Sequence, residues 1–344
     1  MYNLYDFSLE KLEKLLMEKY GQKKYRATQL FIWIYEKRVR DFDLMSDISA
    51  SFREVLKRDF VLELPEIETK QVSLDGTIKL LLKMKDGVKV ETVLMRYDYG
   101  NSVCVSSQVG CNMGCSFCAS GLLLKNRDLT PSELIGQLLV MESLMEGEKI
   151  SHVVVMGSGE PFDNYENVMD FIRIVNHHKG FNIGARHITV STCGIPHKIV
   201  KFANEGLQVN LAISLHAPND ELRSKLMKIN KVYPLKVLMA AVKDYERITN
   251  RRVTYEYIML KGVNDTNEHA KQLANLIKGT LNFVNLIPYN SVDEHGYKRS
   301  ERVVVREFAD SLKKLGVNVT IRKEFGPDID AACGQLRAKK EGAL

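Results

Sequence analysis

The sequence predicts an α/β protein built around an incomplete (β/α)6 barrel. From about residue 100, six short runs rich in β-branched residues alternate with helical stretches. These six units take roughly 200 residues, fewer than the ~250 of a closed eight-stranded barrel. Five of the runs end in polar or glycine-rich residues, and ligands of parallel βα folds bind at that edge of the sheet. A doubly wound sheet is the alternative arrangement.

The chain before the barrel is expected to form two smaller units. Apolar residues spaced three and four apart predict helices over 8–21, 25–39 and 47–60, with Ser8 as a cap and Gly21 at a helix end. We assign residues 1–62 to a helical accessory domain. Two Asp-Gly pairs between runs of strand formers then predict an antiparallel β-meander linker over residues 63–98.

The barrel itself is assigned to residues 99–322 and a C-terminal loop to residues 323–344. The six expected strands cover 102–107, 152–157, 187–192, 209–215, 253–260 and 283–289. Helices are expected between them, for instance over 131–145, 164–177, 234–248 and 266–278.

Composition indicates a cytoplasmic protein without a membrane span. Apolar residues make up 45% of the 344-residue chain, and the N-terminus has neither a continuous apolar stretch nor the pattern of a signal peptide. In a reducing compartment, cysteines are more often ligands or catalysts than structural disulfides. The net charge of +6 is compatible with a polyanionic partner.

A cluster of three cysteines, Cys111, Cys115 and Cys118, follows the first expected barrel strand. Structural zinc normally has four ligands, so zinc here requires Cys104, Cys193 or a histidine in addition. A four-iron cluster held by three cysteines leaves one iron open to a substrate or cofactor. The spacing in this context resembles the signature of radical S-adenosylmethionine (SAM) enzymes.

The next strand ends in a glycine-rich loop, "GSGEP", that contains Gly157, Gly159 and Glu160. Read locally it is a turn. One strand after the cysteine cluster, it resembles the loop that receives the methionine moiety of SAM. Later strand ends add candidate SAM contacts, which are Ser191, Ser214, Leu215, His216 and Asn290.

Three cysteines lie outside the cluster. By spacing alone Cys104, Cys193 and Cys333 are buried thiols, although "FGPDIDAACGQL" (325–336) has the composition of a loop that returns to the active edge.

Several segments together resemble the RlmN/Cfr family of radical SAM RNA methyltransferases. They extend almost to the last residue and include "CVSSQVGCNMGCSFC", "MGSGEPFDN", "ISLHAPNDELRSKLMKIN" and "GPDIDAACGQL".

The resemblance implies methylation of an adenine ring carbon in 23S rRNA and tRNA. It implies a [4Fe–4S] cluster on Cys111, Cys115 and Cys118 and two SAM molecules per turnover. Cys333 would carry the methyl group, Cys104 would release the product through a transient disulfide, and Glu91 would accept the ring proton. An electron donor such as flavodoxin or ferredoxin is expected, with a monomeric enzyme and no membrane partner.

The sequence indicates the methylated ring carbon and the RNA contacts less directly than it indicates the cluster ligands. "GEPFDN" and "SLHAPND" favour the RlmN branch, which methylates carbon 2, over the Cfr branch, which methylates carbon 8, whereas residues 118–129 depart from the usual RlmN segment. Tyr25, Arg26 and Trp33 are candidate RNA contacts. A zinc-containing RNA-binding protein without catalysis is the alternative from a different class.

Overall fold

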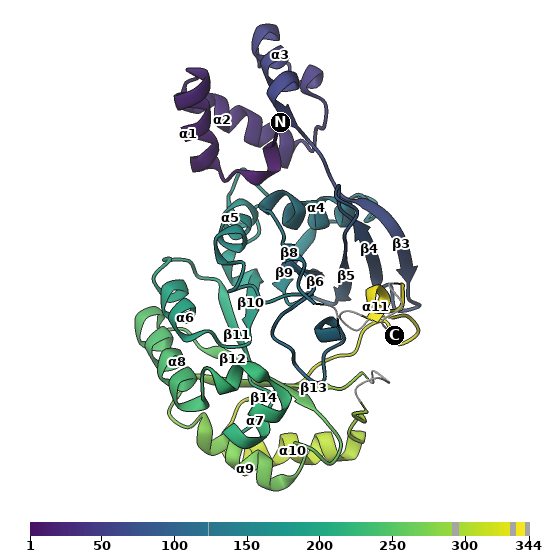
Figure 1. Ribbon diagram of the computed structural model, residues 1–344, viewed down its shortest axis with the longest axis vertical. Helices are drawn as coiled ribbons and strands as arrows, with labels where there is room; N and C mark the ends of the chain where they lie inside the picture. The colour runs from purple at the N-terminus through teal and green to yellow at the C-terminus, as the bar shows by residue number, and fades with distance from the viewer. Residues whose placement is uncertain (123, 291–295, 331–334, 341–344) are drawn as a thin grey trace.

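A mixed β-sheet forms the centre of the computed structural model, which describes residues 1–122, 124–290, 296–330 and 335–340 (Figure 1). In the described chain the sheet has ten strands in the order β14-β13-β12-β11-β10-β9-β6-β5-β4-β3. Seven are mutually parallel, namely β6 (Gly100–Val105), β9 (Ile150–Val155), β10 (Ile188–Thr192), β11 (Asn210–Ser214), β12 (Val253–Met259), β13 (Asn282–Pro288) and β14 (Val319–Ile321).

All six strands predicted for the barrel are present, and β14 is an additional one. β14 has only three residues, so although all three are β-branched it is too short to stand out as a strand in the sequence. The connecting helices are α4 (Pro131–Glu142), α5 (Tyr165–Asn176), α6 (Pro196–Ala203), α7 (Asp220–Leu226), α8 (Leu235–Thr249), α9 (Asn267–Leu276) and α10 (Arg302–Lys314). They lie along the outside of the curved sheet (Figure 1), which is the arrangement of a partial barrel and not of a doubly wound fold.

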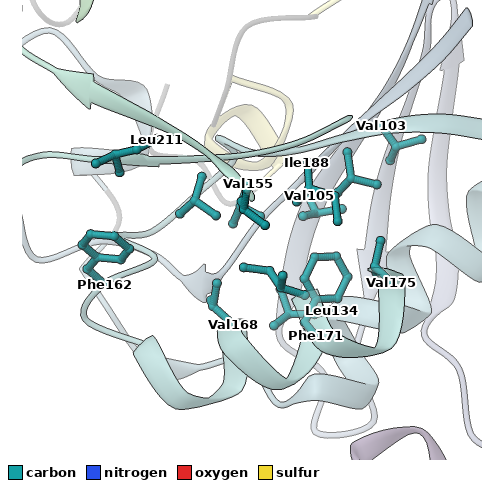
Figure 2. Packing of buried hydrophobic residues seen from close by; sticks show 14 of the residues in the cluster. Val103, Val105, Leu134, Val155, Phe162, Val168, Phe171, Val175, Ile188 and Leu211 are labelled. Carbon is teal, nitrogen blue, oxygen red and sulfur yellow. The ribbon is translucent and has the colours of Figure 1, made fainter. Parts of the chain in front are cut away.

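Alternation along the strands separates a helix-facing core from the barrel interior. Val103 and Val105 of β6 pack with Leu134 of α4 and Phe171 of α5 in the main core (Figure 2). Cys104 lies between the two valines in sequence, so its side chain points to the opposite face. There it belongs to a small cluster with Val93 and Met95. The thiol is thereby directed into the barrel.

The N-terminal helices form a separate layer above the barrel (Figure 1). They are α1 (Leu9–Tyr20), α2 (Lys24–Phe31), which continues as a π-helical turn to Glu36, and α3 (Ala50–Asp59). Ser8 caps α1 by accepting from Lys11 N at 3.5 Å, and Gly21 ends it with φ of 61°. Arg38 Nε donates to Glu142 of α4 at 2.6 Å and ties this layer to the barrel.

The predicted meander is present and extends the barrel sheet. It consists of β3 (Glu66–Val72), β4 (Ile78–Lys83) and β5 (Lys89–Tyr97), and β5 pairs antiparallel with β6. Helix α11 (Gln335–Lys340) lies beside it (Figure 1). Two short pairs complete the strands, β1 (Tyr2–Asn3) with β2 (Phe60–Val61) and β7 (Gln108–Val109) with β8 (Arg127–Asp128).

Helices of the described ranges are all too short or too polar to cross a membrane.

Candidate active site

A cavity of about 660 Å³ opens at the carboxyl ends of the barrel strands. Its walls come from strand ends, from the cysteine loop and from residues 322–330 and Gln335. The structure gathers there most of the residues that the sequence singled out, namely Cys104, Cys111, Cys115, Cys118, Gly159, Glu160, Ser191, Ser214, His216 and Asn290.

Two predicted site residues do not line the cavity. Leu215 is fully buried in the main hydrophobic core, so its contribution at this strand end is the backbone, whose N–H donates to Glu256 O at 3.1 Å. Glu91 lies on β5, on the same face of the strand as the cavity-lining Val93 two residues later, and is not itself among the lining residues. Cys333 lies outside the described residues, but Asp330 and Gln335 on either side of residues 331–334 both line the cavity.

The cysteine loop is anchored to the opposite side of the barrel. Ser116 N donates to Leu226 O at 2.9 Å, and the Ser116 hydroxyl lies 2.9 Å from the Tyr297 hydroxyl. Burial raises the pKa of Cys111 to about 11 and that of Cys115 further. Thiols so placed ionise only with a cation or metal beside them.

Three soft thiol donors on one loop, all facing one cavity, fit a thiophilic metal group. Within the described ranges no three His, Cys, Asp or Glu side chains stand close enough together to hold a metal ion as they are.

The glycine-rich loop after β9 packs tightly against the end of β6. A Cβ added at Gly159 would lie 2.6 Å from Gln108 Cβ and 2.7 Å from Gln108 N, and one at Gly157 would lie 2.8 Å from Ser106 Cα. Gln108 Oε1 also accepts from Glu160 N at 2.9 Å. The missing side chains of these glycines therefore leave room for the neighbouring strand end, and both glycines also line the cavity.

Glu160 joins two strand-end loops. Its Oε1 accepts from Phe162 N at 3.0 Å and its Oε2 from Cys193 N at 2.7 Å. Burial raises the pKa of this carboxyl, and the hydrogen bond from Cys193 opposes that rise. Both N–H bonds leave further lone pairs on the carboxylate, so an ammonium group in the cavity still finds an acceptor.

The polar residues on β10, β11 and the following turn form one wall. The Ser191 and Ser214 hydroxyls are 3.3 Å apart on neighbouring strands. His216 has φ of 59°, accepts from Ile258 N through Nδ1 at 3.2 Å, and places its ring edge-on to Phe117 with centroids 4.9 Å apart. Burial, followed by the charge of Arg223, lowers the pKa of His216 to about 3, so the ring is neutral.

Arg223 holds this wall in place and was not predicted. Its guanidinium is fully buried and donates to Cys193 O at 2.6 Å, to Leu215 O at 3.2 Å and to Ser214 O at 3.3 Å. A fourth bond reaches Asn230 Oδ1 at 2.9 Å. In the sequence Arg223 is one of several charges on a short polar helix, and nothing there distinguishes it from a solvent-facing residue.

Two further acid and thiol groups were also missed as cavity residues. Glu256 points inward from β12, accepts from Asn285 Nδ2 at 2.9 Å, and has its pKa raised by burial. Cys193, interpreted as a small residue near a strand end, lines the cavity with its sulfur 3.5 Å from that of Met113. Strand alternation could have indicated Glu256, because it is an acidic residue in an otherwise apolar and aromatic strand.

The chain matches two sequence families along its length. The Radical SAM superfamily matches residues 105–277, and the Ribosomal RNA large subunit methyltransferase N-terminal domain matches residues 2–62. The fold and the three cysteines that line its cavity, Cys111, Cys115 and Cys118 (the thiol triplet), therefore define a radical SAM enzyme. This class uses a [4Fe–4S] cluster and SAM.

Curated relatives narrow the class. "Probable dual-specificity RNA methyltransferase RlmN" of Shouchella clausii is 54% identical over 98% of this chain and 97% of the relative, and the protein of that name from Listeria welshimeri is 55% identical over 98% and 94%. The chain belongs to the RlmN family. Among solved structures, a radical SAM methyltransferase from Sphaerobacter thermophilus has a TM-score of 0.91 and 42% identity, covering 97% of this chain and 99% of that one.

Proposed function

We propose that this enzyme methylates carbon 2 of an adenosine in 23S rRNA and in tRNA, with the methyl group carried on Cys333. The observation that carries the proposal is the shared cavity of Cys104, the thiol triplet and the two residues that flank the Cys333 segment, Asp330 and Gln335. The RlmN family membership supports RNA as substrate and favours carbon 2 over carbon 8.

The three cysteines of the triplet would hold the cluster, with the fourth iron position left for SAM. When bound, the cluster would supply the single electron that turns SAM into a carbon radical, and this radical takes hydrogen from a methylthio group. Each turnover would therefore use two SAM molecules, one as the source of the methyl group and one as the source of the radical. Flavodoxin or ferredoxin is the proposed electron donor.

Cys333 and Cys104 divide the sulfur chemistry between them. The methyl carbon on the Cys333 sulfur forms the new bond to the electron-poor ring carbon, which ties the base to the protein. Glu91 accepts the ring proton. Once the adduct has given up the unpaired electron left by the radical addition, Cys104 attacks the Cys333 sulfur and the bond between that sulfur and the methylene carbon breaks. The electron pair of that bond stays with the carbon, which takes up a proton to become the methyl group of the product, and a cellular thiol reduces the Cys104–Cys333 disulfide before the next turnover. Cys104 is 6% exposed on the inner face of β6, which suits a thiol that must reach only into the cavity.

The N-terminal helices are the proposed RNA-binding domain, and their exposed side chains are the proposed contacts. Tyr25 is 54% exposed, whereas Trp33 is 9% exposed and donates its indole N–H to Asp47 at 2.5 Å. Arg26 bonds Gln29 at 2.6 Å within the domain. Tyr25 is therefore the better candidate for stacking on a base, and Trp33 supports the domain's own fold.

The substitution Cys104→Ala tests this function directly. Incubated anaerobically with SAM, reductant and RNA, the variant should accumulate a covalent RNA–protein adduct, and the double variant with Cys333→Ala should not. Cys193→Ala is the matched control, a second cavity cysteine that should leave turnover free of adduct. Absence of adduct in Cys104→Ala would remove the resolving role from Cys104.

Two measurements separate the alternatives. Liquid chromatography with mass spectrometry of digested product RNA, run against 2-methyladenosine and 8-methyladenosine standards, distinguishes the two isomers, which have the same mass. Metal analysis after anaerobic reconstitution should give about four irons per chain; a colourless protein that takes up only zinc would instead support the non-catalytic RNA-binding alternative.

A further inference from the structure

A buried ion pair lies in the meander beneath the C-terminal segment. Lys79 Nζ of β4 is 2.9 Å from Glu91 Oε2 of β5, and the two side chains are 0% and 6% exposed. In the strand register Lys79 lies opposite Val93 and Leu81 opposite Glu91, so the two charged side chains are diagonal neighbours on one face of the sheet. A pair so far from water is held by mutual attraction and by further hydrogen bonds.

Those further bonds go to the C-terminal segment on both sides of residues 331–334. Lys79 Nζ also donates to the backbone carbonyl of Asp330. Glu91 Oε1 accepts from Arg337 N at 2.7 Å. The Lys79–Glu91 pair thus binds the backbone at Asp330, immediately before residues 331–334, and at Arg337, shortly after them.

Other hydrogen bonds between the meander and this segment lie closer to solvent. Gly326 N donates to Asp75 Oδ2 at 2.9 Å, Leu74 N donates to Asp328 Oδ2 at 3.1 Å, and Gln71 Nε2 donates to Asp330 Oδ2 at 3.1 Å. These bonds compete with water, whereas the buried pair does not. Losing one charge of the pair leaves the other buried without its counter-charge, which is the costly event in this interface.

We propose that Lys79 and Glu91 form a latch that holds the C-terminal segment in its docked position, with Lys79 as a positioning residue. This rests on the proposed function in one respect, the role of Glu91 as proton acceptor. When the ring C–H bond breaks, its electron pair stays with the base and the proton binds a Glu91 oxygen. The carboxylate becomes a neutral acid, and its attraction to Lys79 falls.

The latch therefore loosens at one point in the reaction sequence. Proton transfer to Glu91 precedes the step in which Cys104 must reach the Cys333 sulfur. The described residues on either side of 331–334 are thus held before proton transfer and released after it, ahead of the step in which Cys104 attacks.

Hydrogen exchange of the full-length, cluster-reconstituted chain tests the latch without SAM or RNA. The variants are Lys79→Met, Glu91→Gln, which mimics the neutral acid, and both together. Each single change should raise amide exchange in peptides covering 326–330 and 335–340 at least about tenfold, equivalent to about 1.4 kcal/mol. Barrel peptides over β10 and β11 should be unchanged.

The double variant separates electrostatic coupling from packing. A coupled pair predicts that the two changes together raise exchange no more than either one alone, because the double variant has lost both charges of the pair. Lys85→Met is the matched control, since Lys85 is also 2.9 Å from its partner Glu63 but is exposed; it should change nothing.

Three results would overturn the latch. These are unchanged exchange in the single variants, effects that multiply in the double variant, and loss of protection that extends to β10 and β11. Because the measurement uses no substrate, a wild-type enzyme that failed to methylate RNA would defeat the proposed function and leave this result standing.

Discussion

Replacing Gly159 by alanine should disrupt the loop that supports Glu160. The residue has φ of 105°, a conformation that side chains with a Cβ rarely adopt, and an added Cβ would lie 2.6 Å from Gln108 Cβ and 2.7 Å from Gln108 N. These contacts include the backbone of Gln108, the first residue of β7, which cannot move aside as the end of a flexible side chain would.

The magnitude follows from two separate costs. Backbone strain at such a φ costs about 1–3 kcal/mol, and forcing an extra methyl into a packed site costs about 1–3 kcal/mol more. Gly147 supplies the control, because it has φ of 90° but nothing within 4 Å of an added Cβ. Gly147→Ala should therefore show the strain alone, and Gly159→Ala both costs.

Urea denaturation of the two variants measures the difference. We expect the free energy of unfolding to fall by about 1–3 kcal/mol more for Gly159→Ala than for Gly147→Ala. SAM binding to the reconstituted enzyme should also weaken in Gly159→Ala alone, since Glu160 follows it directly. Equal losses of stability in the two variants would refute the steric argument.

Three further predictions concern other parts of the chain. Arg223→Met should lower the free energy of unfolding by at least about 3 kcal/mol in urea denaturation, because it removes four buried hydrogen bonds to three carbonyls and an amide oxygen; a loss below about 1 kcal/mol would show that water replaces the guanidinium. Burial, followed by the neighbouring His187, lowers the pKa of His152, so the folded state favours its neutral form, and this contribution to stability is present above about pH 6.5 and lost as the pH falls below it. His152→Asn should flatten the dependence of unfolding free energy on pH between about 5 and 7, and an unchanged slope would contradict the assignment. Tyr25→Ala should weaken RNA binding by about 1–3 kcal/mol in a filter or anisotropy assay while the proposed methylation of Cys333 by SAM is unchanged; unaltered RNA affinity would exclude Tyr25 from the interface.

Local sequence patterns predicted most of the barrel and placed its ligand-binding site at the carboxyl ends of the strands. The six strand runs, the intervening helices and the two Asp-Gly turns are signals of short range, set by side-chain branching, periodicity and glycine conformation. The parallel connectivity then brings the strand ends to one edge, which is why ten of the thirteen predicted site residues line a single cavity. β14 escaped prediction because three β-branched residues are too short a run to indicate a strand without their pairing with β13.

The cysteine spacing and the family segments determined the class of chemistry, because a ligand set and its loop are written in consecutive residues. The tertiary structure alone decided what surrounds them. Arg223 and Lys79 read as surface charges in sequence, and each is buried because strands or loops distant in the chain close over it. Glu91 and Arg337 meet across 246 positions. Such contacts depend on how the sheet curves and where the C-terminal segment returns, and no local pattern encodes either.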